Sequence, residues 1–158
     1  MKDSHVKAKR YALNLLRYRG RSEKELAQKL RRKDIPEAVI VSTIESLKNS
    51  GLVNDQQLAE NLKRHALSVK LYSYYAARQF VLSRGIPKWI VDIILPRDDY
   101  SDIENARKLI QKKMIAMKKY PKDVSRIKLY RSLSRKGYSS GTITRALKEN
   151  DFHEEESQ

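Results

Sequence analysis

Apolar residues recur at helical spacing, and one pattern of them occurs three times along the chain. Its first copy, SEKELAQKLRRKDIPEAVIVSTI, spans Ser22–Ile44, and shifts of 51 and 103 residues lay it over Ser73–Leu95 and Ser125–Leu147. Within a copy, apolar positions four residues apart form one stripe on each of two helices. The stripe residues are Leu26, Leu30, Ile40 and Ile44; Ala77, Val81, Val91 and Leu95; Leu129, Leu133, Ile143 and Leu147. Such self-similarity indicates a tandem helical repeat.

The ends of these helices are marked at matching positions in the three copies. Each copy begins with a serine suited to an N-cap, and its first helix ends on a cation followed by a residue that tolerates the left-handed region. An apolar anchor and a residue suited to a helix start come next. In copy order, these positions are Ser22, Ser73 and Ser125; Lys33, Arg84 and Lys136; Asp34, Gly85 and Gly137; Ile35, Ile86 and Tyr138; Pro36, Pro87 and Ser139.

A further helix is predicted before each copy. The first covers Val6–Tyr18, the second begins at Asn54-Asp55 and runs through Leu67, and the third runs from Asp102 to the break at Tyr120-Pro121. The sequence therefore predicts an all-α fold of three tandem three-helix repeats, at 1–53, 54–97 and 98–150, in an elongated, curved, solenoid-like arrangement. Residues 98–102 are the candidate linker, and the acidic tail 151–158 is expected to be disordered.

Composition supports a helical protein without catalytic chemistry. The 158 residues include five glycines, four prolines and no cysteine, and no alternating strand pattern occurs. No apolar run is long enough for a membrane span or a signal core, so we expect a cytoplasmic protein with no membrane contact. His5, His65 and His153 stand apart, without metal-ligand or catalytic spacing. We therefore expect no enzyme activity, no cofactor and no metal.

The net charge of +15 favours an acidic partner such as nucleic acid. Cations concentrate in three blocks: 12 Lys/Arg against three acids in residues 1–33, six against none in 63–90, and 14 against one in 106–148. The alternative is that the charge only keeps a helical protein soluble. Because these cation-rich blocks recur with the repeat, they predict one basic face that continues through all three units.

The candidate binding residues lie in these blocks. They comprise Lys29, Arg31, Arg32, Lys33, Lys70, Arg78, Arg84, Lys128, Arg131, Arg135 and Lys136. A cation in the last turn of a helix also complements the helix dipole, which accounts for one cation per copy. It does not account for the run Arg31-Arg32-Lys33.

Aromatic residues interleave with cations in the second copy. Tyr72, Tyr74, Tyr75 and Phe80 stand beside Lys70 and Arg78. Such a group can stack bases and bind phosphates of a single strand. Core packing is the favoured interpretation for Tyr75 and Phe80.

Three stretches of the sequence stand out: Arg21-Ser22-Glu23-Lys24-Glu25-Leu26 with Leu30 and the Lys33-Asp34-Ile35 turn, the run from Gly51 to Ala59, and Arg84-Gly85-Ile86. In their order and spacing they resemble the RecX family, small regulators of the RecA recombinase. Two departures are Asp34, where the family prefers glycine, and the lead-in Leu71-Tyr72-Ser73-Tyr74-Tyr75.

The resemblance implies a regulator that binds in the helical groove of the RecA–DNA filament and inhibits its ATPase and strand exchange. It places the chain in homologous recombination, DNA repair and the SOS response. Its expected partners are the RecA filament and, weakly, single- and double-stranded DNA, and the protein is expected to be a monomer. One alternative is an independent DNA-binding protein acting through phosphate contacts. Another is an assembly scaffold, whose binding would not depend on salt.

Overall fold

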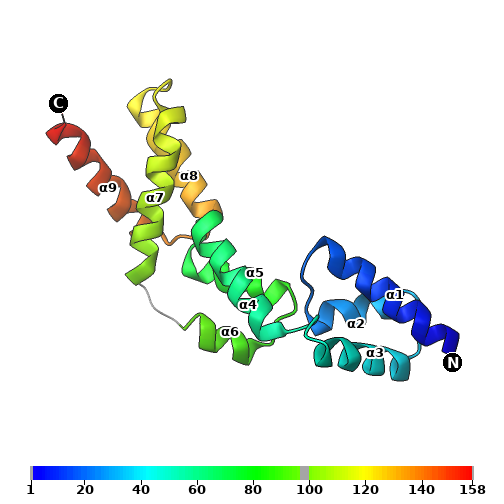
Figure 1. Ribbon diagram of the computed structural model, residues 1–158. Helices are drawn as coiled ribbons and strands as arrows, with labels where there is room; N and C mark the ends of the chain where they lie inside the picture. The colour runs from blue at the N-terminus through cyan, green and yellow to red at the C-terminus, as the bar shows by residue number, and fades with distance from the viewer. Residues whose placement is uncertain (1, 97–99, 158) are drawn as a thin grey trace. The chain divides into compact units, whose positions relative to one another are not determined.

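The computed structural model describes residues 2–96 and 100–157, and all regular structure in these ranges is helical (Figure 1). The elements are α1 (Lys2–Tyr18), α2 (Glu23–Arg31), α3 (Glu37–Asn49), α4 (Asp55–Arg64), the π-helical turn η1 (His65–Val69), α5 (Tyr74–Ser83), α6 (Lys88–Ile94), α7 (Tyr100–Met117), α8 (Lys122–Arg135) and α9 (Ser140–Glu156). The predicted all-α helical repeat fold is thereby confirmed.

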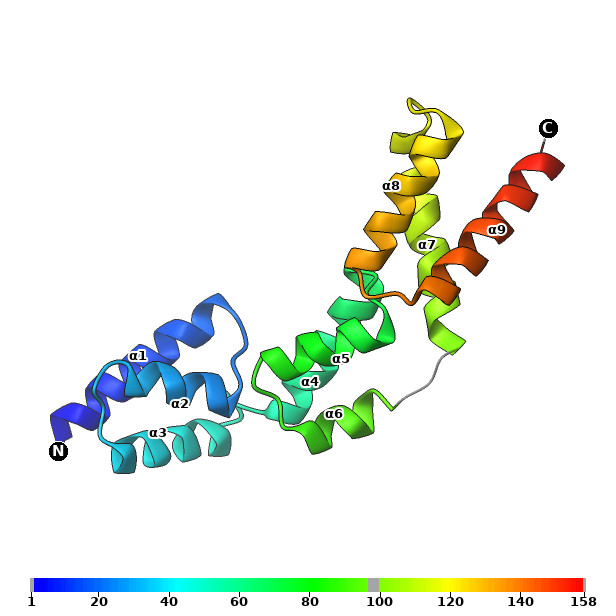
Figure 2. The same ribbon diagram turned by 180° about the vertical axis from the view of Figure 1, so that it is seen from behind.

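The chain divides into two compact units. Unit 1 comprises residues 1–62 and 81–94, and unit 2 comprises residues 63–80 and 95–158. Each unit contains a complete terminal repeat, α1–α3 or α7–α9, and part of the second repeat (Figure 2). The second repeat is therefore shared between its neighbours rather than compact by itself.

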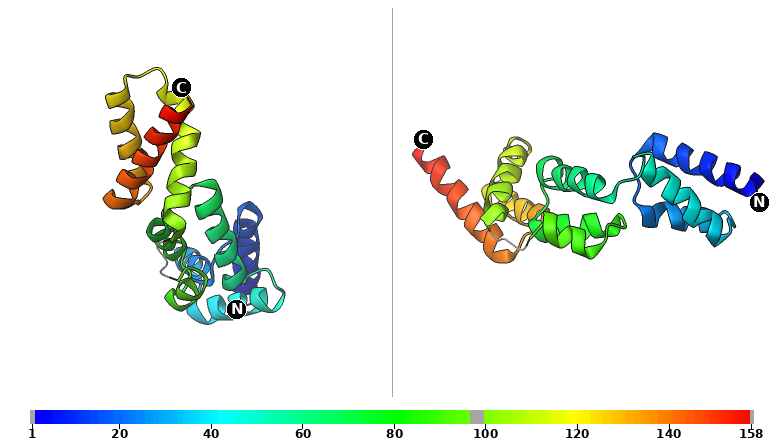
Figure 3. Two further views of the ribbon diagram at one scale, coloured as in Figure 1. Left: turned by 90° about the vertical axis from the view of Figure 1, so that its left-hand side faces the viewer. Right: turned by 60° about the horizontal axis from the view of Figure 1, so that its bottom comes forward.

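Each terminal repeat has its own apolar core. The unit 1 core consists of Ala8, Ala12, Leu26, Leu30, Val39, Ile40, Ile44, Leu47 and Val53. The unit 2 core consists of Leu71, Ala106, Leu109, Ile110, Leu129, Leu133, Tyr138, Ile143, Ala146 and Leu147, around which α7, α8 and α9 pack as a three-helix bundle (Figure 3). All the predicted stripe residues are buried. The sequence pattern thus identified the core face of every repeated helix.

Two of the three predicted serine caps are present. Ser22 Oγ accepts a hydrogen bond from Glu25 N at 3.1 Å, and Ser73 Oγ accepts one from Ala76 N at 3.0 Å. The prediction for Ser125 is wrong, because α8 begins one turn earlier, after Pro121. Ser125 lies inside α8 and donates instead to the carbonyl oxygen of Met117 at 3.0 Å.

The three predicted stops all adopt the left-handed conformation, with φ of 54° at Asp34, 80° at Gly85 and 89° at Gly137. A Cβ on Gly85 would lie 2.5 Å from Ser22 Oγ, and one on Gly137 would lie 2.6 Å from Ser73 Oγ. Glycine is therefore needed at these two turns for two reasons: the serine side chain lies too close for a Cβ, and the backbone φ is positive. Asp34 is exposed, so its side chain extends into solvent and the family's preferred glycine is not required there.

At Gly85 and Gly137, a turn of one repeat contacts a serine of the repeat before it. We call each of these two contact regions a joint. In unit 1, Ser22 Oγ donates to the carbonyl oxygen of Arg84 at 2.7 Å. In unit 2, Ser73 N donates to the carbonyl oxygen of Lys136 at 3.0 Å. Each joint thus holds the turn of a following repeat against the N-terminus of a preceding helix.

A carboxylate completes each joint. Asp55 Oδ1 accepts from Glu23 N, the first residue of α2, at 3.0 Å. Asp102 Oδ1 accepts from Tyr74 N, the first residue of α5, at 2.7 Å. Serine and aspartate together satisfy two of the N–H groups that a helix leaves without partners at its start.

The C-terminal helix extends further than the sequence suggested. α9 continues to Glu156, through most of the tail for which disorder was expected. Ion pairs fix its acidic part, with Arg107 Nε 2.7 Å from Glu149 Oε2 and Arg126 Nη1 2.7 Å from Asp151 Oδ2. Of the candidate linker 98–102, residues 98 and 99 lie outside the described residues, and Tyr100, Ser101 and Asp102 belong to α7.

Candidate functional site

Two of the predicted binding cations are engaged inside the fold. Arg84 Nε lies 3.0 Å from Glu25 Oε1, and its Nη2 donates to the carbonyl oxygen of Gly20 at 3.0 Å. Arg78 donates to the carbonyl oxygen of Leu95. Arg84 therefore supports the unit 1 joint, and its position in the repeat reflects packing as well as charge.

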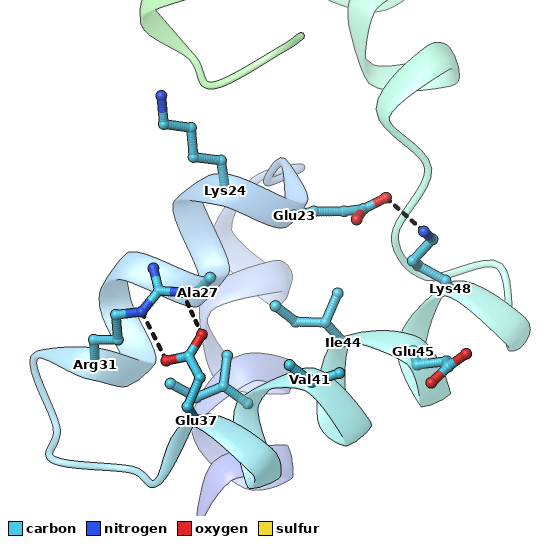
Figure 4. A pocket seen from close by; sticks show the side chains of 10 residues that line it. Glu23, Lys24, Ala27, Arg31, Glu37, Val41, Ile44, Glu45 and Lys48 are labelled. Carbon is cyan, nitrogen blue, oxygen red and sulfur yellow. Dashed lines mark hydrogen bonds and ion pairs between the residues drawn. The ribbon is translucent and has the colours of Figure 1, made fainter.

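A third predicted cation, Arg31, belongs to an open groove between α2 and α3, of about 480 Å³ (Figure 4). Its guanidinium faces Glu37, with Nε 2.9 Å from Oε2, and on the other rim Lys48 Nζ lies 3.0 Å from Glu23 Oε1. The hydrogen bond from Arg31 lowers the pKa of Glu37 below its usual value. Three cations (Lys24, Arg31 and Lys48) and three carboxylates (Glu23, Glu37 and Glu45) line this groove. It therefore has no excess charge to attract an anion.

A second group of predicted cations carries unbalanced charge on the surface. Among the described residues, no carboxylate forms an ion pair with any of its members. In unit 1 they are Lys29, Arg32 and Lys33, and in unit 2 they are Lys128, Arg131 and Arg135. Lys33 Nζ lies 5.5 Å from the centre of the Tyr11 ring, and Lys128 Nζ lies 4.6 Å from that of Tyr120. These six side chains are available to a polyanion.

The remaining two predicted cations, Lys70 and Lys136, meet at the unit 2 joint. Lys136 Nζ donates to the carbonyl oxygen of Lys70 at 2.8 Å. Lys136 Nζ lies 5.1 Å, and Lys70 Nζ 5.6 Å, from the centre of the Tyr72 ring. Residues separated by 66 positions in the sequence thus place two ammonium groups on one aromatic ring.

The aromatic group of the second repeat divides between packing and exposure. Tyr72 and Phe80 are half-buried and in edge contact, with ring centres 5.9 Å apart. This contact agrees with the packing expected for Phe80. The packing expected for Tyr75 is wrong, because 67% of that residue is exposed. Tyr75 therefore lies on the outer side of α5.

Sequence reasoning missed Lys112 and Lys113 of α7. Burial lowers the pKa of Lys136 below its usual value, and the positive charges of Lys70, Lys113 and Lys112 lower it further. The two α7 lysines therefore contribute to the positive potential at Lys136. The excess of cations in residues 106–148 was the available signal, but it did not show which of them act on Lys136.

Other kinds of site receive no support from the geometry. Among the side chains that the structure describes, no three His, Asp or Glu residues come together as a metal-binding group. No described helix is long and apolar enough to cross a membrane.

Comparison with known proteins agrees with the repeat architecture. Residues 8–47 match the family model for the first three-helix domain of RecX, and residues 99–147 match the model for the third. The regulatory protein RecX of Chlorobium phaeobacteroides (strain BS1) is 33% identical over 141 residues, covering 86% of this chain and 88% of that protein. The chain belongs to the RecX family.

Other RecX proteins are similar over most of this chain. The crystal structure of RecX from Lactobacillus salivarius has a TM-score of 0.72 at 27% identity, covering 96% of this chain and 99% of that one. The regulatory protein RecX of Staphylococcus saprophyticus is 29% identical over 99% of this chain. The chain spans 57% of the length of that relative, and 53% of the RecX of Staphylococcus carnosus.

Proposed function

We propose that this RecX-family protein binds the RecA–DNA filament and restrains its ATP hydrolysis and strand exchange. Its relatives are named as regulatory proteins. In addition, many lysine and arginine side chains of the described residues are exposed. The observation that carries the proposal is the group of surface cations without carboxylate partners. A filament that holds DNA phosphates supplies the anionic surface that these cations lack.

Both units contribute to this contact. Unit 1 presents Lys29, Arg32 and Lys33, and unit 2 presents Lys128, Arg131 and Arg135. When one unit is bound, the other is held at high effective concentration, so weak separate contacts produce tight overall binding. Salt should weaken the contact, since exposed charges are screened. A bound protein in the groove would block incoming duplex DNA or resist the subunit movements that accompany ATP turnover.

The test is the DNA-dependent ATPase of the cognate recombinase at a fixed filament concentration, with this protein added up to an equimolar amount. We expect ATP hydrolysis and strand exchange to fall. Unchanged rates at equimolar protein would contradict the proposal.

A variant pair identifies the contribution of the unpaired cations. R32A/R131A/R135A removes three such cations and is expected to weaken the inhibition strongly. K7A/K88A/R145A removes the same charge from residues that already pair with Asp3, Asp92 and Glu149. The control variant is expected to inhibit almost as well as the wild type. The carboxylates paired with these three cations already offset their attraction for an anionic partner.

A further inference from the structure

An open groove between α4 and α6, of about 360 Å³, lies wholly within unit 1, and we call it the Trp89 groove. Trp89 and Ile93 are one turn apart on α6 and are 57% and 69% exposed. More than half of the chain's single tryptophan is therefore open to solvent. The residues that line the groove are Asn54, Gln56, Gln57, Glu60, Trp89, Ile90, Ile93 and Ile94.

The other two repeats show that the fold does not require large apolar side chains at these two positions. In copy order, the equivalent residues are Ala38, Trp89 and Gly141 at the first position, and Ser42, Ile93 and Arg145 at the second. All six are exposed. The second repeat thus places a tryptophan and an isoleucine where its neighbours have small or polar residues. An exposed apolar pair that the fold does not need is typical of a binding surface.

The rim of the groove offers amides. Asn54 Oδ1 accepts a hydrogen bond from Gln57 N at 3.0 Å, which caps the start of α4. Gln56 and Gln57 are exposed. A primary amide both donates and accepts, so these side chains suit the peptide groups of another chain.

The charge of the groove does not suit nucleic acid. Among the described lining residues, Glu60 carries the only charge, and that charge is negative. Lys88 precedes Trp89, but its Nζ lies 2.6 Å from Asp92 Oδ2. A phosphate would meet repulsion from the carboxylate and no surplus of cations. Tryptophan and other large apolar side chains are instead enriched at the centre of protein interfaces.

We propose that the Trp89 groove docks a segment of a recombinase subunit, with a large apolar side chain of that segment packed against Trp89 and Ile93. The rim amides hydrogen-bond to the peptide groups of the segment. The inference rests on the proposed function and deepens it, because it separates a protein contact in this groove from the contacts of the unpaired cations. Salt does not screen such an apolar contact, whereas it screens the cations.

The variant I93R distinguishes a protein contact from a phosphate contact by the sign of its effect. It gives the second repeat the residue type that the third repeat has at the equivalent position, Arg145, and position 93 is exposed, so the fold should tolerate it. Binding of the full chain to recombinase-coated DNA is measured beside binding to bare DNA. We expect I93R to weaken filament binding by about tenfold, because it puts a charge into an apolar contact. Tighter filament binding by I93R would show that the groove faces phosphates and would overturn the proposal.

The variant W89A/I93S removes the apolar pair without changing any charge. It introduces the residue types that the first repeat has at these positions, Ala38 and Ser42. We expect filament affinity to fall by at least about tenfold, with unchanged affinity for bare DNA and an unchanged salt dependence of the binding that remains. I115S alters an isoleucine of α7 that is 78% exposed, and this control should bind as the wild type does. An equal loss for I115S would show that the effect is not specific to the groove and would contradict the proposal.

Trp89 also reports on the groove without any loss of side chains, because the chain has no other tryptophan. A hydroxylated tryptophan analogue at this position can be excited apart from any tryptophan of the recombinase. We expect its emission to shift to shorter wavelength, and its quenching by acrylamide to decrease, when filaments are added but not when bare DNA is added. Unchanged emission and quenching on bound filaments would overturn the proposal, even if a variant binds weakly because it folds poorly.

The outcomes separate this groove from the proposed function. If the wild type binds the filament and both variants bind it equally well, the groove is outside the contact and the proposed function stands. If the wild type does not bind recombinase-coated DNA, the proposed function is wrong and the docking proposal is wrong with it.

Discussion

The hydroxyl of Ser22 donates a hydrogen bond to the carbonyl oxygen of Arg84, 62 residues later in the chain, at 2.7 Å. The same hydroxyl oxygen accepts from Glu25 N and so caps α2. One side chain therefore begins a helix in the first repeat and holds a turn of the second. Ser73 connects the second repeat to the third through its backbone N–H and also caps α5. The repeats are thus coupled through their caps as well as through apolar packing.

The joints predict that Gly85 and Gly137 are far less replaceable than an ordinary turn glycine. G85A and G137A would each place a methyl group against a serine hydroxyl, at 2.5 and 2.6 Å. We expect each to lower the free energy of unfolding by about 1–3 kcal/mol beyond the cost of the left-handed backbone, as in other overpacked sites. Urea or thermal unfolding measures the loss.

Gly51 supplies the control for this comparison. Its φ is 75°, yet a Cβ there would meet nothing within 4 Å. G51A should therefore show only the backbone cost, about 1–2 kcal/mol. Equal losses for G51A, G85A and G137A would show that the close approach of the joints contributes nothing.

Asp55 is predicted to act in its joint as a hydrogen-bond acceptor rather than as a charge. Burial raises the pKa of this carboxyl, and its bond from Glu23 N offsets that only in part. The ionised form is therefore disfavoured by folding at neutral pH. D55N retains an acceptor oxygen and is expected to stay within about 0.5 kcal/mol of the wild type, whereas D55A should lose about 1–2 kcal/mol. Denaturant unfolding at neutral pH distinguishes the two, and similar losses for both would show that the charge is needed.

The structure predicts that Arg84 and Arg131 have different roles, although both were candidate binding residues. R84A removes the half-buried bonds to Glu25 and Gly20 and should cost about 1.5–3 kcal/mol of stability. R131A, at an exposed position without a carboxylate partner, should leave stability unchanged and weaken filament binding. Unfolding and filament-binding measurements on both variants test this division. A stable R84A or an unstable R131A would reverse the assignment.

Tyr138 should make the stability of unit 2 sensitive to alkaline pH. Burial, with a smaller contribution from Asp102, raises the pKa of its hydroxyl well above the usual value of 10. Folding therefore favours the neutral phenol, whose contribution is full below pH 10 and is lost as the pH rises further. Y138F should cost about 1 kcal/mol near neutral pH, because the Leu71 carbonyl loses its donor.

The difference between wild type and Y138F should shrink when unfolding is measured above pH 10. Y18F alters a residue that is 87% exposed and serves as the control, with no expected change at any pH. A constant difference across the pH range would show that the Tyr138 hydroxyl does not titrate with unfolding.

Local rules were sufficient to predict the repeats. Leu26, Leu30 and their equivalents follow helical periodicity, and the left-handed stops at Asp34, Gly85 and Gly137 follow from steric preference at helix ends. The start of α8 was predicted incorrectly, because Pro121 is a stronger start signal than Ser125 and comes one turn earlier.

The candidate site was less predictable, because its cations differ in their partners rather than in their type. Arg84 and Lys136 occupy equivalent positions in the repeat, yet Arg84 pairs with Glu25 while Lys136 donates to the carbonyl oxygen of Lys70. These partners lie 59 and 66 residues away in the sequence, so no local pattern identifies them. The predicted single basic face remains a prediction, since each unit presents its own group of cations.

The most direct test of filament binding is co-sedimentation of this protein with RecA–DNA filaments, compared with bare single-stranded and duplex DNA under the same conditions. We expect the tightest binding to recombinase-coated DNA, weaker binding to both bare forms, and a loss of binding as salt increases. Equal affinity for coated and bare DNA would instead identify an independent DNA-binding protein. Filament binding that does not change with salt would contradict a role for the unpaired cations in the contact.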